Sequence, residues 1–73
     1  MKRYYAALGM NTDDTIYGIG TSPDGALSDA IRWADDGPYR VVPITEALYR
    51  HVEEHGWLSP DRWTLNDSGE LDI

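Results

Sequence analysis

The sequence predicts an α+β domain: a small antiparallel sheet with two helices, in the order β-β-α-β-α-β-β. Two stretches place apolar residues at helical spacing between capping residues. Five short stretches rich in aromatic or β-branched residues are separated by turn-forming residues, as strands are. A chain of 73 residues has room for one compact domain, residues 1–73, because typical domains contain at least ~50 residues.

The first two strands are predicted to pair as a hairpin. The segment 3–8 is rich in tyrosine and alanine, and the segment 15–19, Thr-Ile-Tyr-Gly-Ile, is a second short strand that leads into Gly20. Between them lies Asn-Thr-Asp-Asp at 11–14, a turn-forming cluster, because Asn and Asp side chains bond neighbouring backbone amides. Gly18 and Gly20 are expected to allow a tight turn into the following helix.

The first helix gives the strongest local signal. Ser22 can cap it, Pro23 suits its first position, and Asp24 favours the positive end of the helix dipole. Gly37 and Pro38 are predicted to end it. The apolar residues that follow the cap share one helical stripe: Ala26, Leu27, Ala30, Ile31 and Ala34.

The remaining elements follow the same logic. A third strand is predicted over 39–44, and Pro43 places its end, or a sheet edge, at that point. A second helix is predicted over 46–55, between the N-cap Thr45 and Gly56. The segments 63–65 and 70–73 are expected to form a final hairpin around a glycine-containing turn.

Composition excludes several classes of function. The chain has no cysteine, so disulfides, thiolate metal sites and cysteine nucleophiles are absent. With 6 basic and 13 acidic residues the net charge is −7, which disfavours direct binding to nucleic acid or to an anionic membrane. The apolar stretch behind Met1-Lys2-Arg3 is too short for a signal peptide, so we expect a cytoplasmic protein.

One motif suggests metal chemistry. His51-Val52-Glu53-Glu54-His55 matches H-x-x-E-H, the inverted zinc-peptidase pattern, in which two histidines one helical turn apart share a metal. Such enzymes take a further ligand and a cleft from a much longer chain. We therefore interpret the two histidines as amphipathic residues beside a partly buried face and assign no metal.

No other motif points to catalysis or to a cofactor. Gly18-Ile19-Gly20 lies between a strand and a helix, as a phosphate-binding loop does, but Pro23 takes the place of the third glycine and Asp24 would repel phosphate. The serines occupy turn or cap positions without a partner base. The sequence therefore predicts no catalytic residue, no cofactor and no enzyme activity.

The acidic residues are unevenly distributed. Residues 11–36 contain six Asp against one Arg, and rigid carboxylates on a compact domain can imitate a phosphate backbone. Trp33 lies at the border of the apolar stripe among carboxylates, and the sequence predicts that it acts as an aromatic anchor for a partner. The candidate partner-binding residues are Asp13, Asp14, Asp29, Trp33, Asp35 and Asp36.

Two resemblances bear on function. Residues 20–30 resemble the strand-to-helix junction of HicB-like antitoxins, G-x-T-x-x-E-A-x-x-x-A, with Thr21 one place early and Gly25 in the place of Glu. The chain as a whole is similar in type to phage-encoded anti-CRISPR proteins, because it is short, acidic, cysteine-free and rich in Trp and Tyr.

Together these observations predict a small acidic, non-enzymatic inhibitor. The resemblance to anti-CRISPR proteins implies a basic, nucleic-acid-binding protein or complex as partner, whose access to DNA or RNA is blocked by charge mimicry. The alternative implied by the first resemblance is an antitoxin module that neutralises a cognate toxin through specific packing.

Overall fold

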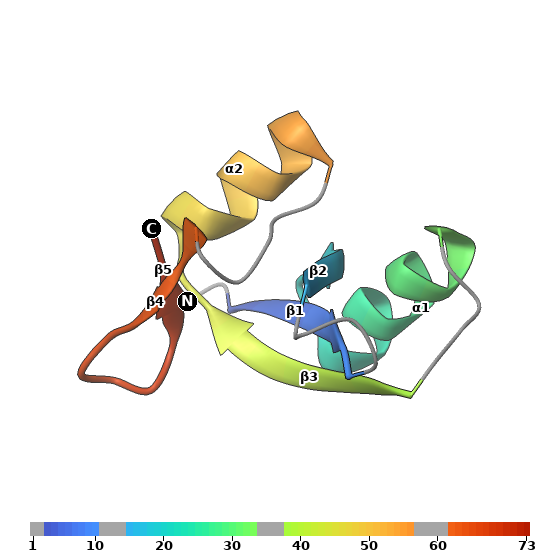
Figure 1. The fold of residues 1–73 in the computed structure, drawn as a ribbon, viewed down its shortest axis with the longest axis horizontal. Coiled ribbons are helices and arrows are strands. Elements are labelled where there is room, and N and C mark those ends of the chain that lie inside the picture. The colour runs from blue at the N-terminus through green and yellow to red at the C-terminus, as the bar shows by residue number, and fades with distance from the viewer. Residues whose placement is uncertain (1–2, 11–14, 34–37, 57–61) are drawn as a thin grey trace.

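The fold is an α+β arrangement of two helices and a five-stranded sheet (Figure 1). The computed structural model describes residues 3–10, 15–33, 38–56 and 62–73. In chain order the elements are β1 Tyr4–Gly9, β2 Thr15–Gly20, α1 Pro23–Trp33, β3 Tyr39–Ile44, α2 Glu46–His55, β4 Thr64–Leu65 and β5 Leu71–Asp72. The α+β class with two helices is thereby confirmed.

The sheet is mixed, and the prediction of a purely antiparallel sheet is wrong. Its strand order is β2-β1-β3-β5-β4. β1 pairs antiparallel with β2 and β3, and β4 pairs antiparallel with β5, but β3 and β5 run parallel through the single pair Ile44–Leu71. After β3 the chain passes through α2 into β4, and the antiparallel hairpin of β4 and β5 then gives β5 the direction of β3.

A β-bulge sets the direction of the side chains of β2. Ala7 pairs with Gly18, whereas Leu8 pairs with Ile16, so Tyr17 is the extra residue. Side chains alternate between the two faces of a regular strand, and residues 16 and 19 would therefore point to opposite faces. The bulge brings Ile16 and Ile19 to the same face, where both contact the larger apolar cluster.

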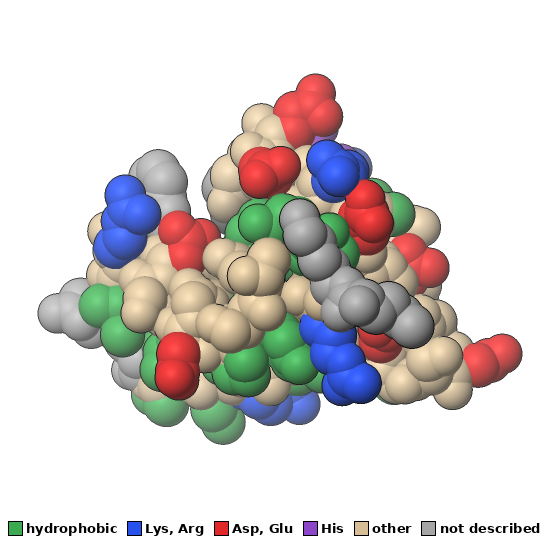
Figure 2. All heavy atoms as spheres, turned by 180° about the vertical axis from the view of Figure 1, so that it is seen from behind, with side chains coloured by type: hydrophobic (Ala, Val, Ile, Leu, Met, Phe, Trp, Pro, Cys, Tyr) green, Lys and Arg blue, Asp and Glu red, His purple; other side chains and the backbone are tan. Residues whose placement is uncertain are grey.

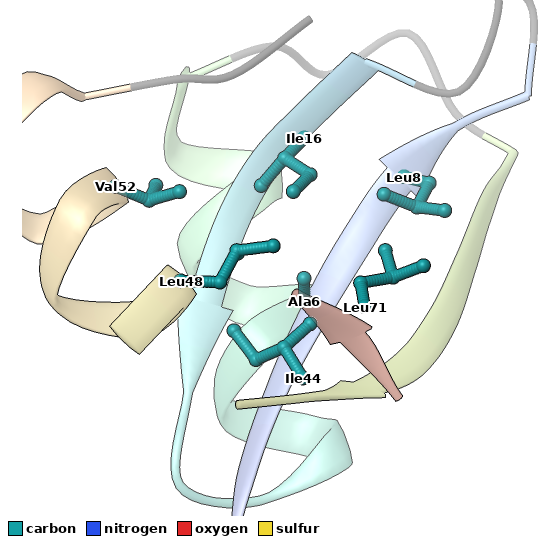
Figure 3. Packing of buried hydrophobic residues seen from close by; sticks show 7 residues of the cluster. All are labelled: Ala6, Leu8, Ile16, Ile44, Leu48, Val52 and Leu71. Carbon is teal, nitrogen blue, oxygen red and sulfur yellow. The ribbon is translucent and has the colours of Figure 1, made fainter. Parts of the chain in front are cut away.

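The helices cover different faces of the sheet. Ala6 and Leu8 of β1 lie in the cluster that contains Leu48 and Val52 of α2, whereas the intervening Ala7 packs with α1. Figure 1 shows α1 and α2 set apart with strands between them. The larger cluster is drawn in Figure 3, where side chains from four strands and α2 converge: Ala6, Leu8, Ile16, Ile44, Leu48, Val52 and Leu71.

The two glycines of β2 serve close packing rather than a turn. A Cβ at Gly18 would lie 2.3 Å from the backbone nitrogen of Ala30, and one at Gly20 would lie 2.6 Å from that of Ala26. Neither has positive φ, which among the described glycines is found at Gly56 and Gly69. The expected role in a tight strand-to-helix turn is therefore corrected: these positions lack side chains because the backbone of α1 lies directly against β2.

Both predicted helix starts are confirmed. Ser22 Oγ accepts a hydrogen bond of 3.0 Å from the Gly25 amide, and Thr45 Oγ1 accepts one of 3.3 Å from the Leu48 amide. The second helix ends as predicted at Gly56, whose φ is 95° and whose amide donates to the Val52 carbonyl. The first helix extends through Trp33, and its predicted end at Gly37 lies outside the described residues.

Thr45 also joins α2 to the C-terminal hairpin. Its hydroxyl donates to Asp72 Oδ1 at 2.9 Å, and its amide donates to the Leu71 carbonyl at 2.9 Å. The hairpin itself turns at residues 66–69, where Asn66 Oδ1 accepts from the amides of Ser68 and Glu70.

Neither α1 nor α2, the helices that the described ranges contain, has the length and apolarity needed to cross a bilayer.

Candidate functional site

The structure places few of the predicted partner-binding residues. Asp13, Asp14, Asp35 and Asp36 lie outside the described residues. Trp33 is the last residue of α1, and the placement of its side chain also lies outside the description. Asp29 is therefore the member of the set whose side chain can be analysed.

The carboxylate of Asp29 accepts a hydrogen bond within the molecule. Asp29 lies on α1 with a half-buried side chain, and its Oδ2 accepts a hydrogen bond of 3.1 Å from the amide of Ile19 in β2. β2 is an edge strand of the sheet, so this carboxylate occupies a backbone donor at that edge. A role for Asp29 in partner binding would compete with this bond.

The residues that flank the two acidic segments meet at one end of the sheet. Gly9 of β1 pairs with Thr15 on one side and with Tyr39 on the other. Beyond this pair, the Met10 amide donates to the Pro38 carbonyl at 3.2 Å. The chain positions that precede and follow segment 11–14, and the one that follows segment 34–37, are thus neighbours in space.

The other acidic side chains of the described ranges are dispersed. On the face drawn in Figure 2, the visible acidic side chains form separate groups, with basic side chains between some of them. Glu46 is paired with Arg50 at 2.9 Å, and Asp72 accepts from Thr45 and from the Ile73 amide. The acidic face that the sequence suggested is therefore not made by these residues.

A hollow of about 280 Å³ lies where α2 passes near the β2 edge. Ile19 and Val52 give it apolar walls, Tyr49 contributes a ring, and Asp29 and Glu53 bring carboxylates from the two helices. Tyr49 also packs against Tyr4, with ring centroids 4.4 Å apart. The hollow thus combines an aromatic surface with negative charge.

The surroundings of the hollow raise the pKa of Tyr49. Burial of the phenol raises its pKa above the ordinary 10.0, and the negative charge of Glu53 raises it further. The nearby charge of Asp29 acts in the same direction, whereas Arg50 lowers the pKa. Burial disfavours a charge of either sign at this position, whereas the two carboxylates disfavour a negative charge in particular.

Tyr49 and Glu53 were not among the candidate partner-binding residues that the sequence analysis named. Their proximity to Asp29 arises because helices covering different faces both reach the edge strand β2, which is a tertiary feature. Tyr49 follows the buried Leu48 in the helical pattern, and nothing in that pattern distinguishes it from an ordinary boundary residue. No local signal in the sequence could have found this hollow.

The two histidine rings of α2 lie side by side in a tilted arrangement. Their ring centroids lie 4.4 Å apart with an interplanar angle of 39°. His51 is half-buried and His55 is exposed. Within the described ranges, no three His, Asp or Glu side chains are grouped so that they could hold a metal ion together.

Comparison with known proteins finds no matching family model, no matching curated protein and no matching solved structure.

Proposed function

We propose that this chain is a small acidic, non-enzymatic inhibitor that binds a basic, nucleic-acid-binding protein or complex and blocks its access to DNA or RNA. It would act as anti-CRISPR proteins of the charge-mimicking type do. The observation that carries the proposal is the meeting of Met10, Thr15 and Pro38 at one end of the sheet. The two aspartate pairs, Asp13-Asp14 and Asp35-Asp36, belong to the segments that these residues flank.

Chain connectivity supports a shared surface. Asp14 is bonded directly to Thr15, and Asp36 is separated from Pro38 by one residue. The proposal therefore assigns both aspartate pairs to one partner-binding surface beside this end of the sheet. Four carboxylates close together are the kind of charge array that a phosphate-binding groove recognises.

The proposed mechanism is electrostatic competition. The net charge of −7 would steer the protein toward a basic groove and accelerate its association, an effect that salt screens. Lys and Arg side chains that normally contact phosphates would then contact the aspartates, with Trp33 as an apolar anchor beside them. Nucleic acid and this protein would exclude each other from the groove.

The test compares two sets of four charge-neutralising substitutions. One variant carries Asp→Asn at positions 13, 14, 35 and 36, and the matched control carries Asp24→Asn, Glu53→Gln, Glu54→Gln and Asp67→Asn, all at exposed positions. Asp29 is left intact in both, because it holds the β2 edge. Both variants have the same net charge, so the comparison isolates the position of the charges.

The measurement is capture of partners from host-type lysate, followed by stepwise elution with salt and with competing duplex DNA. We expect the wild type and the control to retain a nucleic-acid-binding complex that moderate salt or DNA releases. The first variant should capture at least about tenfold less of the complex than the control does, and the part that it retains should depend less on salt. Equal capture by both variants would refute the proposal, and one small protein retained through high salt would favour the antitoxin alternative.

A further inference from the structure

The histidine pair of α2 carries an inference of its own. The rings of His51 and His55 lie one helical turn apart at a centroid distance of 4.4 Å. From the sequence alone we expected no metal here, because peptidases with this motif take a further ligand and a cleft from a much longer chain. We propose that the two imidazoles form a surface site for one divalent transition-metal ion of the Ni²⁺, Cu²⁺ and Zn²⁺ class.

The distance between the rings fits shared coordination. Metal–nitrogen bonds to imidazole are about 2.0–2.1 Å long, so two rings that occupy positions at right angles on one ion have centroids about 4.5 Å apart. Tetrahedral positions would separate the centroids by about 5.2 Å on the same bond lengths. The observed 4.4 Å is thus close to the right-angle arrangement, which Cu²⁺ and Ni²⁺ prefer.

Electrostatics also favours a cation at this position. His55 is the last residue of α2 and His51 is one turn earlier. The C-terminal end of a helix carries partial negative charge, because its last carbonyls have no partner within the helix. A net charge of −7 attracts a divalent ion to the molecule as a whole.

The surroundings indicate an open site rather than a closed structural one. His55 is exposed and His51 is half-buried, so an ion can reach both rings from solvent. The described residues supply no three-ligand group, so water or an added ligand would complete the coordination. An open site of this kind binds metal less tightly than a four-ligand structural site. It would also hold the last turn of α2 in place by linking residues i and i+4.

The experiment uses the full chain with any polyhistidine tag removed. Titration calorimetry with Ni²⁺ and with Cu²⁺ gives affinity and stoichiometry, and thermal unfolding with and without the ion gives the linked stabilisation. The variants are His51→Ala, His55→Ala, and a spacing variant that combines His55→Ala with Glu53→His. The spacing variant keeps two histidines but places them at i and i+2, where they point away from each other on a helix.

We expect the wild type to bind one ion per chain and to unfold at a higher temperature in its presence. Each of the three variants should lose at least about tenfold in affinity, since even outer-sphere changes weaken metal sites by 10–100-fold. Their metal-free circular dichroism should match that of the wild type, because neither His51 nor His55 belongs to the buried core. Wild-type affinity in either single variant, or in the spacing variant, would overturn the proposal.

Discussion

Asp29 illustrates at the residue scale how a charge can be read wrongly from a sequence. It lies off the apolar stripe of α1, and from that position alone it suggests a solvent-facing carboxylate. In the structure its Oδ2 bonds the Ile19 amide at the edge of the sheet. The bond connects residues ten positions apart and depends on how closely α1 approaches β2.

We predict that Asp29→Ala destabilises the protein by about 1 kcal/mol, since hydrogen bonds to charged groups contribute about 1.5–3 kcal/mol and this one is only half-buried. The Ile19 amide should also lose its protection against hydrogen exchange. Asp29→Asn is the matched control, because its amide oxygen can accept the same bond. Both quantities can be measured by urea unfolding and by NMR-detected exchange. Unchanged protection of Ile19 in the alanine variant would show that the bond does not form in solution.

At the scale of elements, α1 packs on the sheet through its smallest residues. Ala26 and Ala30 are fully buried against Ala7, and Gly18 and Gly20 give the helix backbone direct access to β2. The interface therefore leaves no space for added volume. Ile31, which the helical stripe predicted to face the core, is 46% exposed because the closest approach occurs along the alanines.

We predict that Gly18→Ala destabilises the protein by about 2–3 kcal/mol, the upper part of the usual range for overpacking. The added Cβ would lie 2.3 Å and 2.4 Å from backbone atoms of Ala30 and Ala26, which cannot move without shifting the helix. Gly25→Ala serves as the control, because its Cβ would meet only the side chain of Ser22 at 3.0 Å and, more distantly, Gly20. It should change the free energy of unfolding by less than about 1 kcal/mol. Similar effects at both positions in denaturant unfolding would contradict the packing of α1 on β2.

At the scale of the whole molecule, the apolar core is divided between two faces of the sheet. The larger cluster joins β1, β2, β3, β5 and α2, and the smaller one joins β1 to α1. Leu71, from a strand of two residues, completes the larger cluster and is 4% exposed. A short C-terminal segment thus contributes to the stability of elements from the beginning of the chain.

We predict that Leu71→Ala lowers the free energy of unfolding by about 2–5 kcal/mol, as other large-to-small core substitutions do. That loss is a large part of the total for a domain of this size, given about 0.05–0.15 kcal/mol per residue. Leu65→Ala is the control on the partner strand, where the side chain is 67% exposed, and should cost less than about 0.5 kcal/mol. Chemical denaturation of both variants measures the difference. Comparable midpoints would show that β5 does not complete the core.

The features that the sequence predicted correctly, helix caps and the bounds of elements, depend on residues that are close together in the chain. The caps at Ser22 and Thr45 formed as expected because each bonds an amide three positions later. The third strand and the second helix have the predicted bounds for the same reason, since local signals mark both ends. The parallel pairing of Ile44 with Leu71 was not predictable in this way, because it joins residues from distant segments through one pair.

The candidate site was less predictable than the fold. Charge in the sequence gives the number of carboxylates but not their partners, and Asp29 proved to have one in the backbone. The bulge at Tyr17 determines the face of Ile19. In the sequence it corresponds only to the three-residue spacing of Ile16 and Ile19, which a regular strand with one isoleucine on each face would also give. The hollow beside Tyr49 depends on that face and on the meeting of two helices, so only the assembled fold reveals it.

The bond between Asp29 and Ile19 has a further consequence for how copies of this protein behave at high concentration. An edge strand with free amides is a template on which a strand of another molecule can add, and repeated addition leads to aggregates. At Ile19 the outward amide is already occupied, and an incoming carbonyl would meet a carboxylate of like polarity. The same side chain that fastens α1 to the sheet therefore blocks growth of the sheet from one molecule into the next at this position.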